Sequence, residues 1–429
     1  MFFVVLVLNF IDSLYKKKKM LYIFTSYLFL ARKKSLIVLF LLGLVLVSYL
    51  GSILISKEYE VNNVQDVLNV IFTSAILLIF IHGFNSYKKL EQIQFSGRNE
   101  NLVKIVNVIL ILGLSVLLIN IFITFKAFSA LFNQSVNVTE YKNDGGAADM
   151  LAGWVNPILL LYSRLISPIG YLAFGLHFFF LLKKKKWFSF LFFLISLNIP
   201  LLGFHGLSRS AAVQFLLTYF FYLLYILPAL SQKSRRFIFI FGGTAALCLL
   251  SLLNSITDSR FSKFYNIPIE STIQDPIYYS SIDYASQWNH NGIKVMGNFS
   301  YDKLMYGKST LPIVDFTAER IGLEVSRLPE LREIYLTDDY DHTFNGVVAT
   351  LLYDFGYIFT FIFALVFNKF SRITGPSNGK VSLSNFMSFA FLIPLPLLFF
   401  SNNVYSNLAI NIGVVFYIIF VYLLKRIKL

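Results

Sequence analysis

The feature that most constrains this chain is a series of long apolar segments that contain almost no charged residue. A helix that crosses the hydrocarbon core of a bilayer needs about 20 predominantly apolar residues. Backbone polar groups inside the bilayer must be satisfied within the protein, and a helix does this locally. The segments that meet this length are residues 35–55, 66–84, 105–125, 154–182, 187–204, 208–230, 237–254, 345–368, 384–400 and 404–424. The sequence therefore predicts an all-α, polytopic transmembrane bundle of about ten spans.

The composition agrees with this prediction and excludes several soluble classes. Hydrophobic residues make up 56% of the 429 residues, and the mean hydropathy is +0.66, well above the values of a soluble domain. The single cysteine, Cys248, excludes an internal disulfide and a cysteine metal site. The net charge of +14 would suggest a nucleic-acid partner for a soluble protein. In a membrane protein the positive-inside rule explains such a charge, so we expect no nucleic-acid partner.

The charges of the loops between the spans predict the orientation of the bundle. When ten spans alternate, the basic clusters all fall on one side, at residues 16–19, 32–34, 88–89, 183–186, 233–236, 368–372 and 425–428. The joins on the other side carry acidic residues instead. Lysine and arginine concentrate in cytoplasmic loops. We therefore expect both termini to lie in the cytoplasm.

The chain divides into four regions. Residues 1–34 form an interfacial or extra-span segment, 35–254 hold the first seven spans, 255–343 form a long polar loop on the outer side, and 344–429 hold the last three spans. Loops of this length are uncommon and are usually functional. Apolar residues at helical spacing predict one helix over 315–336. We expect a small, partly helical cap over the outer face.

Three ionisable residues lie inside or at the mouth of predicted spans: Arg164, Arg209 and Asp354. An ionisable group in the bilayer is costly and usually faces the bundle interior for a functional reason. A rise of about 1.5 Å per helical residue places all three in the outer half of the membrane, below the long loop. Guanidinium groups bind phosphate oxygens through paired hydrogen bonds. The pattern predicts a polar chamber for an anion, open to the outer side.

Simpler interpretations of these charges stay open. Either arginine could pair with Asp354 and tie two helices together, and Arg209 could reach the surface from a misplaced span edge. Three arginines of the long loop, Arg320, Arg327 and Arg332, have acidic neighbours at helical spacing. We interpret them as part of a salt-bridged surface helix.

Further polar residues stand where the chain enters the membrane on the same side. His342 could transfer a proton, so we take His342 and Asp354 as candidate catalytic residues. His205 and Asn345 join the two span arginines as candidates for substrate binding. Both histidines could instead be solvated. The acidic run 338–341 could hold a divalent cation, but we interpret it as a solvated run and predict no metal site.

The chain resembles O-antigen polymerases of the Wzy type, also called oligosaccharide repeat unit polymerases. The arrangement of ten or more spans with one large periplasmic loop in the second half is similar over nearly the whole chain. The segment "LSRSAAVQFLL" (207–217) is similar to a short entry to a span in that family. The segment "HTFNGVVATLLYDFGYIFTFIFALVFNKF" (342–370) is similar to its re-entry helix. Residues 1–34 match nothing in the family, and both motifs are only moderately specific.

This resemblance implies a GT-C-like, metal-independent glycosyltransferase of the bacterial inner membrane that needs no cofactor. It would join two oligosaccharides carried on undecaprenyl pyrophosphate into O-antigen or capsule at the periplasmic face. Arg209, with Arg164, would hold a lipid pyrophosphate, because preorganised positive charge stabilises an anionic leaving group. Asp354 would orient an arginine or contact the acceptor. Membrane lipids, and a flippase and a chain-length regulator of the same pathway, would be its partners.

Other functions fit part of the same pattern. A transporter or flippase of a lipid-linked anionic glycan also needs intramembrane charges, but we see no repeated halves and the charges gather on one side. The ligase that moves finished O-antigen to lipid A core shares the architecture and the leaving group and differs in its acceptor. A structural membrane subunit is a third alternative, against which the polar outer chamber argues.

Overall fold

The computed structural model describes most of the chain. The described residues are 35–55, 63–88, 90–95, 99–132, 153, 155–206, 208, 210–236, 276–326, 328–336 and 344–426, with isolated positions between 238 and 273. Several predictions fall outside them. These are the predictions for the segment 1–34, for Arg209 and His342, for the acidic run 338–341 and for most of the span 237–254.

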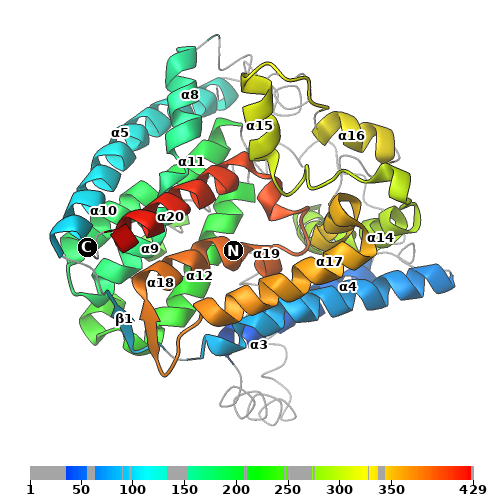
Figure 1. Ribbon diagram of the computed structural model, residues 1–429, viewed down its shortest axis with the longest axis horizontal. Coiled ribbons are helices and arrows are strands. Elements are labelled where there is room, and N and C mark those ends of the chain that lie inside the picture. The colour runs from blue at the N-terminus through cyan, green and yellow to red at the C-terminus, as the bar shows by residue number, and fades with distance from the viewer. Residues whose placement is uncertain are drawn as a thin grey trace.

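The described part is a helical bundle with one small pair of strands (Figure 1). The first half contains α3 (Leu36–Ile55), α4 (Val64–His82), α5 (Asn99–Phe132), α8 (Pro157–Ile166), α9 (Ile169–Leu182), α10 (Lys186–Ser196), α11 (Asn198–His205) and α12 (Ser210–Ile226). The second half contains α14 (Pro276–Gly297), α15 (Pro312–Arg320), α16 (Leu328–Tyr335), α17 (Gly346–Thr374), α18 (Leu383–Leu392), α19 (Pro394–Leu397) and α20 (Leu408–Arg426). The strands β1 (Gln92–Gln94) and β2 (Lys380–Ser382) pair in parallel. The predicted all-α class is therefore correct apart from this short pair.

Several helices are long and apolar enough to cross a membrane. Within the described residues five qualify, over Val64–Ser86, Leu102–Ser129, Lys186–His205, Ser210–Ala229 and Gly346–Thr374. The pair α8 and α9, bent by 45°, would be a sixth if it forms one span. Shorter apolar helices occupy three more of the predicted spans. The structure agrees with the predicted transmembrane helices, whereas their number stays a prediction.

Aromatic side chains fill the core of the bundle. Tyr222 of α12 is fully buried, with its ring stacked on Phe178 of α9 at 5.0 Å and edge-on to Phe389 of α18 at 4.7 Å between centroids. Its hydroxyl donates a hydrogen bond to the Phe386 carbonyl at 3.1 Å, so the polar atom is satisfied inside the apolar core. These contacts join helices that are far apart in the sequence.

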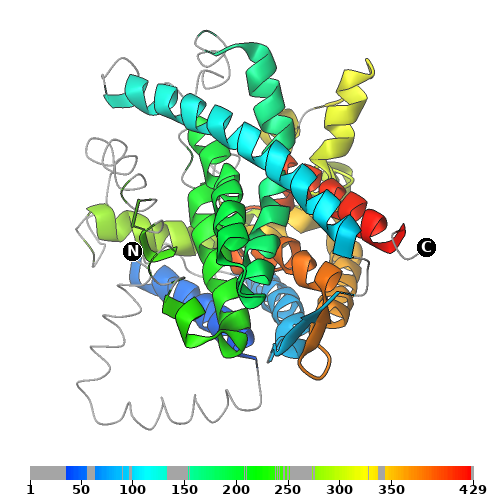
Figure 2. The same cartoon turned by 90° about the vertical axis from the view of Figure 1, so that its left-hand side faces the viewer.

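At one end of the bundle, which we call the basic end, lie loops between helices that carry the lysines and arginines predicted to be cytoplasmic. Ser35, just before α3, donates to the carbonyl of Tyr87 at 2.7 Å. The Tyr87 hydroxyl lies 2.9 Å from the hydroxyl of Thr374, the last residue of α17. The pairing of β1 with β2 follows at the same end (Figure 2). The alternation predicted for α3, α4 and α17 is thus observed, while the membrane side that this end faces stays a prediction.

The opposite end, which we call the outer end, carries the long polar segment (Figure 1). This segment is partly helical, as expected, but α14 belongs to the bundle rather than to a separate cap, because it packs against α3, α4 and α17. The indole of Trp288 donates to Ser48 of α3 at 2.6 Å. Gly292 permits close packing, since a Cβ there would lie 2.5 Å from the carbonyl oxygen of Asn345.

The prediction of one helix over 315–336 is wrong at its centre. The chain forms two helices, α15 and α16, with residues 321–327 between them. Gly322 has a φ of +84°, a left-handed conformation that a helix interior does not contain and that glycine adopts readily. Pro329 then lies in the first turn of α16, where proline is tolerated. The spacing of apolar residues predicts one helix because it carries no information about the backbone conformation of Gly322.

The long helix α17 is also interrupted, at Gly356. This residue has φ 70° and ψ 174°, a conformation that is open essentially to glycine alone. The hydroxyl of Thr360 donates back across the break to the Leu351 carbonyl at 2.9 Å. The Tyr353 carbonyl accepts from the backbone N–H of Met305 at 2.8 Å. The break therefore has hydrogen-bond partners, and one of them comes from the long polar segment.

Replacement of Gly356 tests this break. We expect Gly356→Ala to lower the apparent melting temperature of the detergent-purified protein, because alanine is strained in this conformation by about 1–3 kcal/mol and its Cβ would lie 3.0 Å from the Tyr301 ring. Gly297→Ala is the matched control, since no atom lies within 4 Å of its Cβ position. Fluorescence-detected size-exclusion chromatography after heating measures both. Equal melting temperatures would contradict the assignment.

Cysteine labelling tests the orientation. In a Cys248→Ser background, Asp302→Cys on the exposed surface of the outer end and Asn378→Cys on that of the basic end provide one site each. We expect a membrane-impermeant maleimide to label position 302 in spheroplasts and position 378 only after permeabilisation, because basic joins stay in the cytoplasm. The reverse order of labelling would overturn the predicted orientation.

Candidate functional site

A small polar cavity lies at the outer end, between α16 and the first half of α17. Its volume is about 30 Å³, which has room for one or two water molecules. The polar side chains around it are Ser309, Arg332, Asn345, Thr350, Asn402 and Ser406. They come from four separate parts of the second half of the chain, so the tertiary fold is what assembles this cavity.

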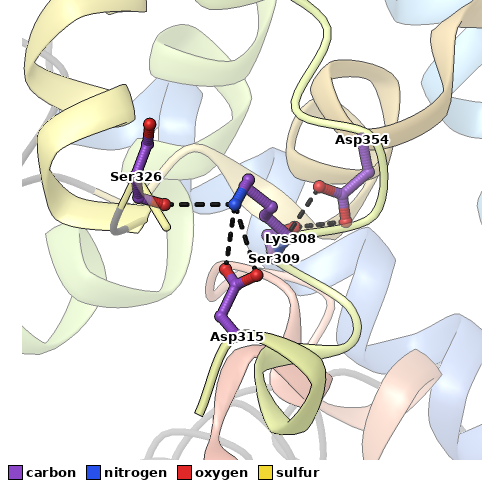
Figure 3. A network of polar contacts seen from close by, with 5 residues as sticks. All are labelled: Lys308, Ser309, Asp315, Ser326 and Asp354. Carbon is purple, nitrogen blue, oxygen red and sulfur yellow. Dashed lines mark hydrogen bonds and ion pairs between the residues drawn. The ribbon is translucent and has the colours of Figure 1, made fainter. Parts of the chain in front are cut away.

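The wall that contains Ser309 is fixed by the carboxylate of Asp354, which is 1% exposed (Figure 3). One carboxylate oxygen accepts from the backbone N–H of Ser309 at 3.0 Å. The other accepts from the hydroxyls of Ser309 and Thr310, each at 2.5 Å. A buried carboxylate is tolerated when hydrogen bonds satisfy it. Asp354 thus binds the turn 306–310 to α17.

The same turn is held from its other side. The amide of Asn403 donates to the Thr310 hydroxyl oxygen at 2.8 Å. The amide of Asn411, in α20, reaches the Thr310 carbonyl at 3.4 Å. The turn therefore connects α17 with α20 and with the segment that leads into it.

Lys308 extends from this turn toward α15 and α16 (Figure 3). Its ammonium group lies 3.2 and 3.3 Å from the two carboxylate oxygens of Asp315 in the first turn of α15. It also donates to the carbonyl of Ser326, two residues before α16, at 3.1 Å. A single side chain thus contacts both α15 and the connection that leads into α16, the helix that lines the cavity.

Two of the predicted site residues meet at this cavity. Asn345 is 4% exposed and lines it, and its backbone N–H donates to the side-chain oxygen of Asn402 at 2.9 Å. Asp354 stands behind the cavity wall. Both carboxylate oxygens of Asp354 are engaged by the turn, so this residue positions the wall, and direct contact with a ligand would require it to release a donor.

Arg332 was missed as a site residue. We interpreted it as an arginine of a solvated surface helix, but it is half-buried and lines the cavity. A sequence signal existed, because Leu328, Arg332 and Leu336 follow at intervals of four residues, which places them on one helix face. An arginine in an otherwise apolar row of a short helix marks a position that faces the protein.

The remaining predicted residues lie elsewhere. Arg164 of α8 is exposed and is close enough to His205 of α11 for an electrostatic interaction. His205 is 7% exposed and hydrogen-bonds to the backbone of Asn120 in α5. Neither Arg164 nor His205 lines the cavity beside α16. The candidates therefore form two groups instead of one chamber.

A buried amide network underlies the group that contains Arg164. The Asn120 amide donates to Ser167 at 2.8 Å and to the Asn198 side chain at 2.7 Å, and its oxygen accepts from Ser163 at 2.6 Å. Ser167 and Asn198 stand where α8 gives way to α9 and where α10 gives way to α11. The network thus satisfies polar atoms at two helix interruptions, as a membrane interior requires.

The alternative of an ion pair between Arg164 and Asp354 is not observed. The hydrogen bonds of Asp354 come from the turn 306–310, and no ion pair joins it to an arginine within the described residues. Arg209 and His342 are outside the described residues, so their predicted roles stay predictions.

Comparisons with known proteins add no assignment. No protein-family model, no curated protein and no solved structure matches this chain. The chemistry of the cavity therefore has to come from its own side chains. Guanidinium, amide and hydroxyl groups offer many hydrogen-bond donors, which suits the oxygen atoms of a ligand at the mouth of this cavity, since the cavity itself has room for water only.

The role of Asp354 can be tested through stability. We expect Asp354→Asn to destabilise the protein by about 1–3 kcal/mol, because buried donors lose their charged acceptor. The apparent melting temperature should fall by a few degrees. Asp302→Asn, at an exposed position of the same segment, is the control and should leave it unchanged. If both variants melt alike, the carboxylate does not hold the turn.

Proposed function

We propose that this protein polymerises lipid-linked oligosaccharide repeat units at the outer face of a membrane. One observation carries the proposal: a helix of the long polar segment places an arginine over a polar cavity at the outer end of an interrupted apolar helix. The donors meet at the membrane surface, where the pyrophosphate of a lipid-linked sugar would lie. The resemblance to Wzy-type polymerases supports the same reaction.

The two halves of α17 suit a substrate with a polar head and an apolar tail. The first half lines the cavity through Asn345 at its start and Thr350. Beyond the break, Ile358 and Phe359 are 66% and 65% exposed, as side chains that face lipid would be. A polyprenyl chain along the second half would bring its pyrophosphate toward the cavity.

The proposed reaction needs positive charge rather than a metal ion. A hydroxyl of the acceptor sugar attacks the anomeric carbon of the donor, the bond from that carbon to the pyrophosphate oxygen breaks, and the hydroxyl proton passes to a base. Arg332 would stabilise the leaving pyrophosphate through paired hydrogen bonds. His342 is the candidate for the base. Arg164 and Arg209, with His205, are the candidates for holding a second lipid pyrophosphate.

Deletion and complementation test the proposal. We expect deletion of the gene to reduce the surface polysaccharide ladder to a single repeat unit, with wild type restoring it. Arg332→Ala and Arg209→Ala should fail to restore it at equal protein level, because loss of one donor to a developing anion costs about 100- to 1,000-fold in rate. Arg320→Ala is the control, since this arginine lies over Phe316 on the exposed surface of α15.

Two outcomes would contradict the polymerase. Deletion that also removes the single repeat unit would favour a flippase or the ligase. Full ladders from Arg332→Ala would exclude the cavity as the site of the leaving group. A reconstituted assay then separates enzyme from transporter, since only an enzyme forms new glycosidic bonds.

A further inference from the structure

We infer that Lys308 is a positioning residue, which fixes α16, and with it Arg332, over the cavity. Lys308 itself does not line the cavity. Its effect on any ligand would therefore pass through the helix that it holds. The placement of α16 is a claim about the fold alone, whereas its catalytic consequence rests on the proposed function.

The backbone that carries Lys308 is held rigidly by its neighbours. Ser309 and Thr310, next to Lys308 in the chain, are 2% and 8% exposed, and Asp354 and Asn403 hold their polar atoms. The backbone on which Lys308 stands is thus bound to the bundle at both following residues. A side chain that begins at a fixed backbone can transmit that position to whatever it contacts.

Lys308 contacts both ends of the segment that leads to α16. Asp315 lies in the first turn of α15, and Ser326 lies in the connection between the two helices, two residues before α16. An ammonium group has three donors, and those of Lys308 reach both residues (Figure 3). The side chains of Lys308 and Asp315 are only 24% and 22% exposed, so solvent screens this pair less than an ordinary surface pair.

Apolar side chains pack little in the described part of the connection between the two helices. Ile321 and Leu323 are 71% and 58% exposed, so their side chains contribute little packing there. α16 itself is held by apolar packing, because Leu328 and Leu331 of its first turn and Leu336 just after it pack in a small apolar cluster that includes Met305 and Tyr353. Without Lys308, α16 should keep its apolar contacts, while the connection that leads into it loses its hydrogen bond at Ser326.

Because the apolar contacts and the Lys308 contacts are separate, removal of the ammonium group should affect the position of α16 and not the folding of the protein. Loss of the Lys308 ammonium should leave a folded protein in which α16 samples several orientations. Arg332 lies one turn after the start of α16, so its guanidinium should shift relative to the cavity. Groups that stabilise a transition state act only when well placed, since a displacement of about 1 Å can cost about 100-fold in rate.

The test uses the distance between two spin labels and needs no activity. In the Cys248→Ser background, Glu333→Cys labels the exposed side of α16, and Lys369→Cys labels the exposed surface of α17 near the basic end. We expect one narrow distance distribution for this pair. Lys308→Met should broaden it, and Lys308→Arg, which keeps the charge, should largely preserve it.

Lys303→Met is the matched control, because it removes a lysine from the same segment whose ammonium donates to the nearby Asn298 carbonyl, at 3.1 Å. It should leave the distribution narrow. An unchanged distribution in Lys308→Met, or equal broadening in Lys303→Met, would overturn the inference. These outcomes do not depend on whether the protein is a polymerase.

Activity then tests the catalytic consequence. With polymerisation measured per amount of folded protein, Lys308→Met should lower kcat about tenfold while KM for the lipid-linked substrate changes less than about twofold. Lys308→Arg should recover most of the loss. Broadening without any loss in an active enzyme would refute positioning of Arg332 for catalysis. A wild-type protein without polymerase activity would refute the proposed function and leave the placement of α16 to the spin-label result.

Discussion

The structure of the outer end depends on one buried carboxylate. Asp354 stands in an apolar helix, where a carboxylate without partners would cost many kcal/mol. Its neighbours on α17 supply no donor, so the donors have to come from elsewhere in the chain. The turn 306–310 provides a backbone N–H and two hydroxyls. Once that turn is bound, Lys308 has a fixed origin, and it contacts Asp315 of α15 and Ser326 before α16 (Figure 3).

The interruption of α17 also requires a hydrogen-bond partner from the long polar segment. At Gly356 the backbone leaves the helical conformation, and the Tyr353 carbonyl takes its partner from Met305. Irregular backbone at membrane depth is tolerated where protein buries it or where it lines a cavity. The break and the carboxylate, two residues apart, thus both require the polar segment 305–310. The cavity lies beside this segment, whose residues Met305 and Ser309 line it.

The sequence predicted the features that depend on local composition. Span length follows from bilayer thickness, so α4, α5, α12 and α17 could be placed from hydropathy alone. Asp354 could be singled out because it is charged within an apolar run. Its partners could not, because Ser309 and Thr310 resemble many other hydroxyl residues of a polar loop. Arg332 was misjudged because the sequence predicts one continuous helix through Gly322. A helix without that interruption places the residues after Gly322 on the wrong faces.

The distribution of polar groups bears on whether such a protein transfers or transports. A transporter needs a polar path that can open to either side. Along α17, below the cavity, the side chain of Phe367 contacts Phe80 edge-on at 5.1 Å. Phe84 and Phe389, with ring centroids 6.1 Å apart, continue this packing toward the basic end. The described polar groups near Arg332 and near Arg164 belong to different helices, α16 and α8. Under the proposed function, two separate groups of polar residues would suit an enzyme that holds two lipid-linked substrates more closely than they would suit a single path across the bundle.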